Sequence, residues 1–320
     1  MSADTTILRL SEADIHPSEG LSQHFLIEST DIQHIARQIE PGACVLEVGP
    51  GTGNITTALA VHAKKIIGVE IDPRFTPFLA NIQSKHSNVQ IIYQNVLILN
   101  LKKLMLAAEP NAPWQIVSNL PFNITEPFLK ALTDLPITDA ILILGQSMTE
   151  RLMADGPLND LLTKTAVMAQ TFFDISVTRT IPKSHFYPES ATNTSVVVLT
   201  PKPAEEFQTN PKLAILRKLF LSEGRHVPIA QVINSIDLPS EDGPIRDKAA
   251  RNRHSRREAR RALKNTATWG SFINLVDNPL DMSAGRSPRT FSLPKSITDQ
   301  PFANLNNHEL RSLIAAIDKN

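Results

Sequence analysis

The sequence predicts an α/β protein with a Rossmann-like, mostly parallel sheet covered by helices on both faces, an antiparallel edge, and a small C-terminal helical domain. Three observations predict this class. Short apolar runs alternate with helical patterns up to about residue 173. Two β-rich runs then follow one another before residue 201, and only helical patterns come after residue 212. Alternating strands and helices are typical of parallel sheets with both faces covered.

Length and composition restrict the class of protein. A chain of 320 residues with 42% hydrophobic and 20% charged residues is typical of a globular protein of about two domains. We expect no membrane contact, because no apolar run approaches the ~20 residues of a membrane span. We also expect a cytoplasmic protein, because the first residues carry no signal or transit pattern. The single cysteine, Cys44, excludes disulfides and a thiolate zinc site within the chain, so no metal is expected.

Residues 1–20 are expected to be irregular, and the first helix is predicted within 29–40, where Ile32, Ile35, Ala36 and Ile39 form one apolar stripe. Five apolar runs then read as buried strands separated by helices. They are ACVLEVG (43–49), KIIGVEI (65–71), VQIIYQN (89–95), QIVSNL (115–120) and AILILG (140–145).

A helix is predicted over 158–173, and the runs 174–181 and 195–200 are predicted to form the antiparallel edge pair. The proline-rich stretch 201–212 is predicted to be the domain boundary. Helical patterns follow at 213–221, 229–236, the arginine-rich segment 246–264 and 307–317. The predicted domains are therefore an N-terminal segment (1–20), a nucleotide-binding α/β domain (21–202) and a helical domain (203–320).

A glycine cluster marks a nucleotide site. In VLEVGPGTGNIT, Gly49, Gly51 and Gly53 stand between a buried strand and a helix, where glycine allows positive φ and close approach to a ligand. Glu70 ends the next strand, at the spacing at which a carboxylate accepts hydrogen bonds from a ribose diol. A tight turn and a surface glutamate would be the purely structural explanation, and the glycines, strand and acid together outweigh it.

The loop chemistry favours S-adenosylmethionine over a dinucleotide. A dinucleotide site uses G-x-G-x-x-G to hold a pyrophosphate on backbone N–H groups. The pattern here is G-P-G-x-G, and Pro50 removes one of those donors. S-adenosylmethionine has no phosphate and tolerates the loss. An NAD-dependent oxidoreductase is the competing class of enzyme.

The strand 115–120 runs into Asn119-Leu120-Pro121-Phe122. Pro121 has no N–H for strand pairing, so the chain leaves the sheet there. Asn119 and Phe122 then lie at the carboxyl edge of the sheet, where open α/β folds bind ligands. A plain strand end followed by a turn is the alternative.

Five motifs in series are similar to those of the ribosomal RNA adenine N6-dimethyltransferases. They are LSQHFL (21–26), VLEVGPGTGNIT (45–56), GVEIDPRF (68–75), NLPFNIT (119–125) and FYPESATNTSVVVL (186–199). That family includes the kasugamycin-sensitivity enzymes of small-subunit maturation and the erythromycin-resistance enzymes acting on large-subunit RNA. The resemblance implies a class I methyltransferase domain, S-adenosylmethionine as cofactor and ribosomal RNA as substrate.

The resemblance also implies a set of cofactor-binding residues. His24 and Leu26 would lie against the methionine moiety, and Glu70 would bind the ribose. At Asn95 the family usually has an Asp that accepts a hydrogen bond from the adenine amino group, and an amide oxygen still accepts it without charge assistance. The implied cofactor residues are His24, Leu26, Gly49, Gly51, Glu70, Ile71, Asn95 and Asn119.

The same resemblance gives the NLPF tetrapeptide a catalytic role. The Asn119 side-chain oxygen and the Leu120 carbonyl are neutral acceptors for the hydrogens of an adenine amino group, which favours a more nucleophilic nitrogen. Pro121 fixes the direction of that carbonyl, and Phe122 offers a face for a flipped-out adenine, worth ~1–3 kcal/mol. Phe186 would add a second stacking surface, with a core position as the equal alternative.

Positive charge is concentrated near the C-terminus. Nine Lys and Arg residues stand against two acidic residues between positions 246 and 264, although the whole chain has no net charge. Such clustering indicates a phosphate-bearing partner, and a solvated basic loop is the alternative. The residues of this segment expected to contact RNA are Arg253, Arg256, Arg257, Arg260, Arg261 and Lys264. The family resemblance adds Arg225 and Phe186.

Three functions remain open from the sequence. The favoured one is dimethylation of small-subunit rRNA adenines by a monomer, within a pre-ribosomal subunit. The second is methylation of large-subunit rRNA. The third is a non-catalytic assembly or transcription factor that keeps the fold and binds RNA.

Overall fold

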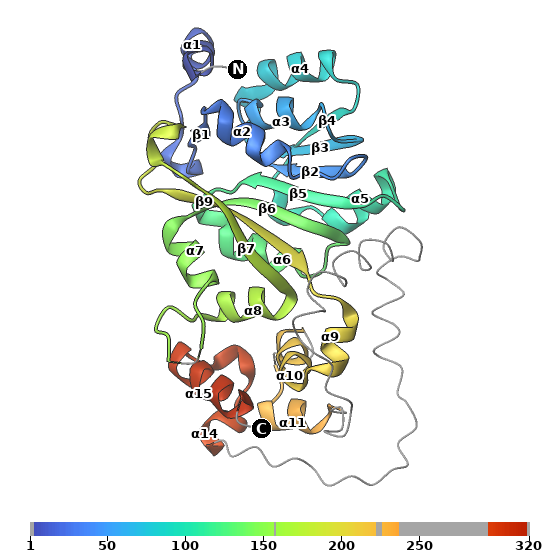
Figure 1. The fold of residues 1–320 in the computed structure, drawn as a ribbon, viewed down its shortest axis with the longest axis vertical. Coiled ribbons are helices and arrows are strands. Elements are labelled where there is room, and N and C mark those ends of the chain that lie inside the picture. The colour runs from blue at the N-terminus through green and yellow to red at the C-terminus, as the bar shows by residue number, and fades with distance from the viewer. Residues whose placement is uncertain (1–2, 157, 222–225, 237–293, 319–320) are drawn as a thin grey trace. The chain divides into compact units, whose positions relative to one another are not determined.

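The computed structural model describes residues 3–156, 158–221, 226–236 and 294–318. The chain divides into two compact units (Figure 1). Unit 1 comprises Met1–Thr149 and Asp174–Pro201, and unit 2 comprises Glu150–Phe173 and Lys202–Asn320. The sequence predicted one change of domain near residue 202. In the structure the chain also passes through unit 2 once before that point.

Unit 1 is built on a seven-stranded sheet in the order β4-β3-β2-β5-β6-β9-β7. The pairs β2–β3, β2–β5, β3–β4 and β5–β6 are parallel, and β6–β9 is antiparallel. The strands are β2 (Cys44–Val48), β3 (Lys65–Glu70), β4 (Val89–Tyr93), β5 (Trp114–Asn119), β6 (Ile137–Gly145), β7 (Phe173–Ile181) and β9 (Thr194–Pro201). The predicted fold class is confirmed, including the antiparallel edge.

Helices connect the parallel strands, as the alternating pattern predicted (Figure 1). In α2 the buried residues include Ile32, Ile35 and Ala36, three members of the predicted apolar stripe. The α-helices of unit 1 are α1 (Ala3–Glu12), α2 (Ser29–Ala36), α3 (Asn54–Leu59), α4 (Thr76–Lys85), α5 (Leu101–Ala108) and α6 (Thr125–Leu132). Five short 3-10 helices lie in its loops: η1 (Glu19–Leu21), η2 (Pro73–Phe75), η3 (Val96–Ile98), η4 (Phe122–Ile124) and η5 (Lys183–His185).

The N-terminal segment differs from the expectation of irregular structure, because Ala3–Glu12 forms helix α1. Thr6 and Leu10 stand one helical turn apart and are both buried. Leu10 and Ile15 belong to the main hydrophobic core of unit 1, so this segment packs as part of the fold.

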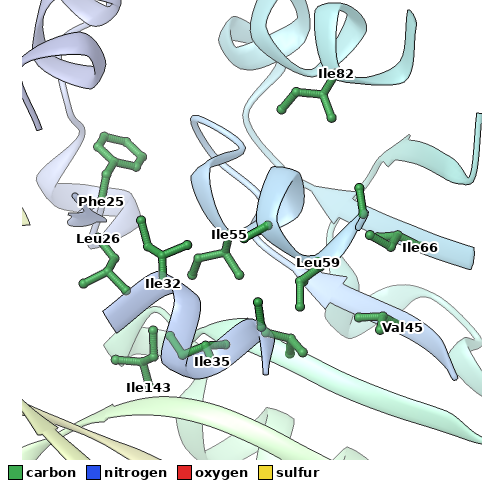
Figure 2. Packing of buried hydrophobic residues seen from close by; sticks show 14 of the residues in the cluster. Phe25, Leu26, Ile32, Ile35, Val45, Ile55, Leu59, Ile66, Ile82 and Ile143 are labelled. Atoms are coloured by element: carbon green, nitrogen blue, oxygen red, sulfur yellow. The ribbon is translucent and has the colours of Figure 1, made fainter. Parts of the chain in front are cut away.

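The main core of unit 1 lies between the sheet and the elements that pack on it (Figure 2). Ile32 and Ile35 of α2 meet Ile55 and Leu59 of α3, and Val45 contributes from β2. Burying such side chains stabilises the fold by about 25 cal/mol per Å² of apolar surface. The same core takes in residues from a second, smaller sheet.

That smaller sheet joins two segments distant in sequence. Strand β1 (Phe25–Leu26) pairs antiparallel with β8 (Phe186–Tyr187). The Ile27 amide continues the pairing by donating to the His185 carbonyl (3.0 Å). The LSQHFL and FYPESAT motifs therefore lie side by side.

Unit 2 is helical and has its own core. Phe220 packs edge-on against Phe302 with ring centroids 4.8 Å apart, and Phe172 contacts both Phe207 and Phe220. Among its described residues the helices are α8 (Lys164–Phe172), α9 (Ala204–Thr209), α10 (Pro211–Phe220), α11 (Ile229–Asn234), α14 (Lys295–Thr298), η6 (Phe302–Asn304) and α15 (Asn307–Asp318). Helix α7 (Gln146–Leu152) spans the point where the chain first leaves unit 1. The helices predicted at 213–221, 229–236 and 307–317 are present as α10, α11 and α15.

Candidate functional site

Four strands of the sheet end at one edge and bring the predicted site residues together. Because β2, β3, β4 and β5 are parallel, the residues that follow them meet at the carboxyl edge. These residues are Gly49 after β2, Ile71 after β3, Asn95 after β4 and Leu120 after β5. The chain order reverses between β2 and β5, and this switch point is where open α/β sheets bind ligands.

The glycine turn after β2 needs glycine for two different reasons. Gly49 and Gly51 have φ of +68° and +53°, a left-handed conformation that side chains disfavour. A β-carbon placed on Gly49 would contact nothing within 4 Å, whereas one on Gly51 would lie 2.9 Å from Cε1 of Phe25. Gly49 therefore opens towards the sheet edge, and Gly51 is the point where β1 closes on the turn.

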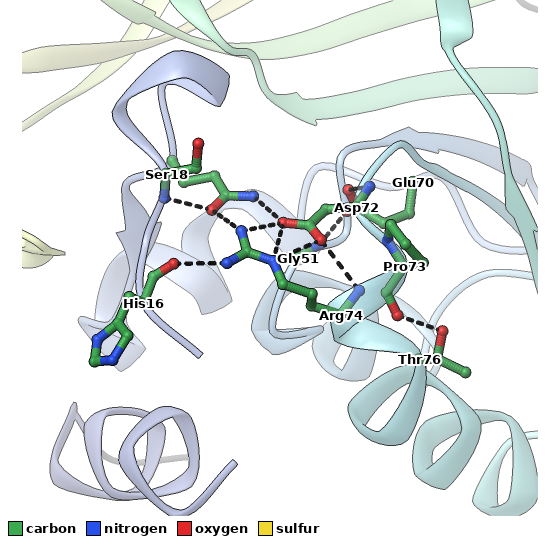
Figure 3. A network of polar contacts seen from close by, with 9 residues as sticks. His16, Ser18, Gly51, Glu70, Asp72, Pro73, Arg74 and Thr76 are labelled. Carbon is green, nitrogen blue, oxygen red and sulfur yellow. Dashed lines mark hydrogen bonds and ion pairs between the residues drawn. The ribbon is translucent and has the colours of Figure 1, made fainter. Parts of the chain in front are cut away.

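Glu70 lies at the end of β3 beside this turn (Figure 3). Its Oε2 accepts a hydrogen bond from the Gly51 amide and its Oε1 accepts one from the Asp72 amide, both at 2.8 Å. Burial raises the pKa of Glu70, and these backbone bonds oppose that rise. The Ile71 backbone amide also bonds to this carboxylate. A carboxylate has about four acceptor positions, so one is left for a ribose hydroxyl. The next residue, Ile71, is 51% exposed and offers an apolar surface at the same edge.

Glu47 is a second buried carboxyl group in this region, and the sequence analysis did not select it. It lies in the middle of β2, and its Oε2 has no hydrogen-bond partner among the described residues. Burial, together with the nearby Glu70 carboxylate, raises the pKa of Glu47 to about 8. The signal in the sequence was a single charge inside an otherwise apolar strand.

Asn95 follows β4 and caps the short helix η3. Its Oδ1 accepts a hydrogen bond from the Leu97 backbone amide (2.9 Å), and the Asn95 backbone amide donates to Oε1 of Gln94 (3.0 Å). The amide oxygen has two lone pairs, so one acceptor position is left for a ligand.

Asn119 ends β5 with its side chain in a fixed orientation. Its Nδ2 donates to the His24 carbonyl at 2.6 Å. Since a carbonyl only accepts, this bond assigns the nitrogen and leaves Oδ1 as the acceptor on the other side of the amide. The Ser118 hydroxyl donates to the Val48 carbonyl (2.8 Å) and fixes the end of β5 against β2.

The turn after Asn119 presents an aromatic face. The Pro121 carbonyl accepts bonds from the Ile124 amide and the Thr125 hydroxyl (both 3.1 Å), which close the turn. Phe122 is 45% exposed, and its ring lies next to Gly145 at the end of β6. The His24 ring is 6.4 Å from the Phe122 ring, centroid to centroid. Phe122 is thus held from one side and remains accessible.

The other predicted side chains are placed as follows. The His24 ring bonds through Nδ1 to the Pro188 carbonyl (3.0 Å), which links the β1 segment to the segment after β8. Leu26 and Phe186 are both buried in the core, and Phe186 exposes only 3% of its surface. Of the two alternatives for Phe186, the structure therefore favours the core position. All the basic residues predicted to contact RNA lie outside the described residues: Arg225, Arg253, Arg256, Arg257, Arg260, Arg261 and Lys264.

Beside Glu70 lies a polar network that the sequence did not reveal (Figure 3). Arg74 pairs with both carboxylate oxygens of Asp72, and Gln23 Nε2 donates to Asp72 Oδ2 (2.8 Å). Arg74 also donates to the His16 carbonyl (3.0 Å). The contacts of Gln23 and His16 join residues 49 and 58 positions apart, so no local pattern could have signalled them.

The described residues contain no group of three or more His, Cys, Asp or Glu side chains placed to hold a metal ion. Within that same part of the chain, no helix is long and apolar enough to cross a membrane.

The sequence model of a family described as ribosomal RNA adenine dimethylase matches residues 18–235 of this chain. The chain belongs to this family. Methyltransferases of this kind generally take the methyl group from S-adenosylmethionine. The residues of the site also fit this cofactor. Gly49 leaves open space, and Pro50 lacks the backbone N–H that would bind a phosphate. Glu70 offers a hydrogen-bond acceptor for the ribose, and Ile71 offers an apolar surface for the adenine.

Curated relatives include a protein of Methanopyrus kandleri named probable ribosomal RNA small subunit methyltransferase A. It is 30% identical over 242 residues, which cover 74% of this chain and 84% of the relative. Proteins named ribosomal RNA small subunit methyltransferase A from Ligilactobacillus salivarius and Geobacillus thermodenitrificans are 31% and 34% identical. Those two matches cover 58% and 57% of this chain, and each spans 64% of the relative's length, just under two thirds.

Two solved structures share the fold over nearly the whole chain. A dimethyladenosine transferase from Plasmodium falciparum gives a TM-score of 0.50 at 18% identity, covering 92% of this chain and 98% of the other. The 23S rRNA methyltransferase ErmE gives 0.51 at 19% identity, covering 92% and 99%. At this identity the likeness establishes the fold and nothing finer.

Proposed function

We propose that this protein is an S-adenosylmethionine-dependent enzyme that dimethylates the N6 amino groups of adenines in small-subunit ribosomal RNA. The observation that carries the proposal is the fixed amide of Asn119, whose oxygen is left as an acceptor at the carboxyl edge. Asn119 ends β5, the strand beside β2 and its glycine turn, and the exposed ring of Phe122 follows three residues later. Family membership and the names of the relatives support the same function.

We assign the cofactor to the residues at the ends of β2, β3 and β4. Glu70 would accept the ribose hydroxyls, Ile71 would pack on the adenine, and Asn95 would accept a hydrogen bond from the adenine amino group. Gly49 and Gly51 would allow the backbone to approach, and His24 and Leu26 would border the methionine end. When bound, S-adenosylmethionine supplies an electrophilic methyl group on a sulfonium.

The chain's own contribution to the chemistry is positioning and polarisation. The Asn119 oxygen and the Leu120 carbonyl would accept hydrogen bonds from the target amino group. Such bonds draw the nitrogen lone pair out of conjugation and direct it towards the methyl donor. Phe122 would stack on the extruded base. Both acceptors are neutral and act without taking up the proton, so it leaves to water, and a second round needs only space for a monomethylated amine.

Three further points remain predictions from the sequence. They are that the RNA is met within a pre-ribosomal subunit, that the protein acts as a monomer, and that it works in the cytoplasm.

Asn119→Ala tests the proposal. We expect the variant to lose methyl transfer to a small-subunit rRNA transcript while its melting temperature stays close to that of the wild type, because one acceptor of the target amine is gone. Methylated nucleosides are measured by mass spectrometry after digestion. Asn123→Ala is the matched control, because Asn123 lies in the same turn, is exposed, and makes only a long contact to the Gly20 carbonyl (3.4 Å). Calorimetry with S-adenosylmethionine and with NADH checks the cofactor.

The outcomes separate the alternatives. Dimethyladenosine formed in large-subunit but not small-subunit transcripts would move the assignment to the erythromycin-resistance type. RNA binding without any methylation by the wild type would indicate a non-catalytic factor. Tight NADH binding would overturn the cofactor assignment. If Asn119→Ala loses activity only because its melting temperature falls and the protein unfolds, the NLPF tetrapeptide is a structural strand end without a catalytic role.

A further inference from the structure

The N-terminal 25 residues lie largely before the family match, which begins at residue 18. In unit 1 they contact the glycine turn and its flanking loop at three separate points. The three contacts are made by Thr6 of α1, by Gln23 and the His16 carbonyl, and by Phe25 of β1.

Helix α1 reaches the residue that directly follows the glycine turn. Asn54 begins α3, and its Nδ2 donates to the Thr6 hydroxyl (3.1 Å) and to the Leu26 carbonyl (3.0 Å). The Thr6 hydroxyl in turn donates to Asn54 Oδ1 (3.3 Å). Thr6 and Asn54 are 2% and 7% exposed. One side chain at the end of the turn therefore holds both α1 and β1, and losing the hydroxyl would leave a buried amide partly unpaired.

Residues 16–23 reach the loop after the ribose carboxylate (Figure 3). Arg74 bridges the His16 carbonyl and the Asp72 carboxylate, and Gln23 joins Asp72 to the Ser18 amide. Burial opposes ionisation of Asp72, but the bonds from Arg74 and Gln23 outweigh it and lower its pKa. The Asp72 amide donates to Glu70, so the network ends on the proposed ribose ligand itself.

Phe25 makes the third contact. Its ring covers Gly51, where a β-carbon would come within 2.9 Å, and stacks edge-on against Phe75 at 5.4 Å. The Gly51 amide donates to Glu70 Oε2. Movement of β1 would therefore release both the turn and the carboxylate that the turn holds.

We propose that residues 3–25 form an N-terminal clamp that sets the glycine turn and Glu70 in the geometry that binds S-adenosylmethionine. Thr6 and Gln23 are its positioning residues, and they act through Asn54, Asp72 and Arg74. A site held in its bound conformation loses less conformational freedom on binding, and so binds more tightly. The inference rests on the proposed function, since it assigns a role towards the same cofactor.

The clamp acts on the cofactor and leaves the target base to Asn119 and Phe122. Weakening it should raise the KM for S-adenosylmethionine and its dissociation constant. The rate at saturating cofactor and the KM for RNA should stay near the wild-type values, because Thr6 and Arg74 touch neither the NLPF turn nor the proposed base site. A purely structural role would instead lower stability and scale all activities by the folded fraction.

Two variants with matched controls test the clamp in the full-length protein. Thr6→Val removes only the buried hydroxyl, and Thr171→Val is its control, because the Thr171 hydroxyl is equally buried and donates to the Val167 carbonyl of its own helix in unit 2. Arg74→Gln removes the bridge to His16, and Arg37→Gln removes a comparable exposed charge at the end of α2. Arg74 is 43% exposed at its side chain, so its loss leaves the core intact.

We expect each clamp variant to weaken S-adenosylmethionine binding by about three- to tenfold in calorimetry, the range of one lost hydrogen bond. The controls should change it by less than about twofold. Unchanged affinity in Arg74→Gln, with unchanged KM for the cofactor, would overturn the clamp. So would a loss confined to melting temperature in both variants. No S-adenosylmethionine binding by the wild type would instead refute the proposed function.

Discussion

Glu47 places a carboxyl group inside the sheet, one strand away from the proposed ribose ligand. Burial keeps this group protonated in the folded chain at pH values where the unfolded chain has already lost the proton, since its pKa is raised from 4.5 to about 8. Unfolding then releases a proton. Stability should therefore be full below pH 4.5 and decline as the pH rises towards 8, by at most about 1.4 kcal/mol per pH unit.

The predicted fall in stability with rising pH can be tested at Glu47 alone. Glu47→Gln removes the titration, so its stability relative to the wild type should rise steadily between pH 5 and pH 8. Denaturant unfolding of both proteins at three pH values measures the difference, and the raised pKa of Glu70 contributes equally to both. A difference between Glu47→Gln and the wild type that stays constant with pH would mean that Glu47 is ionised in the fold.

At the scale of one element, Asn95 caps the helix η3 through its Oδ1, which accepts a hydrogen bond from the Leu97 amide. The proposed contact with the adenine amino group would be a second hydrogen bond to the same oxygen. A carboxylate can accept both bonds with charge assistance and at separate oxygens. Asn95→Asp is therefore expected to bind S-adenosylmethionine about fivefold more tightly in calorimetry, and Asn95→Ala to bind it more weakly. Equal affinity in all three proteins would remove Asn95 from the site.

The elements also mark what local pattern can predict. The five central strands were predictable because each is an apolar run of strand length between helical stretches. Helix α9 was read as a linker because of its prolines, yet Pro203 stands at its N-cap and Pro211 in the first turn of α10, where proline starts helices. Helix α1 was missed because its inward face carries a threonine, Thr6, in place of a repeating apolar stripe.

The candidate site divides in the same way. The glycine turn and the NLPF tetrapeptide were predictable, because clustered glycines between a strand and a helix favour a turn with positive φ and a proline ends strand pairing. The Gln23–Asp72–Arg74 network was not, since its parts approach only after β3 and the N-terminal segment have packed. Phe186 shows the opposite limit: its motif was visible, and its burial depended on the pairing of β1 with β8.

At the scale of the whole molecule, charge is distributed unevenly. The chain is neutral overall, yet the segment 246–264 carries nine basic and two acidic residues. That segment lies outside the described residues, so the expectation for it depends on sequence alone. On a helix, Arg253, Arg256, Arg257, Arg260, Arg261 and Lys264 would share one face, and like charges at i,i+4 would each cost ~0.2–0.5 kcal/mol. RNA phosphates would offset this repulsion and release counterions on binding.

Changing Arg256, Arg257, Arg260 and Arg261 to Gln should therefore weaken rRNA binding and leave S-adenosylmethionine affinity unchanged. The slope of log K against log[salt] should become shallower by roughly 3 to 4 units if all four contact phosphates. Filter binding over a salt series measures the slope. The same four positions changed to Lys keep the charge and should keep the slope, which separates phosphate neutralisation from arginine-specific geometry. If the Gln variant retains the wild-type slope, the segment faces solvent and the RNA is held elsewhere.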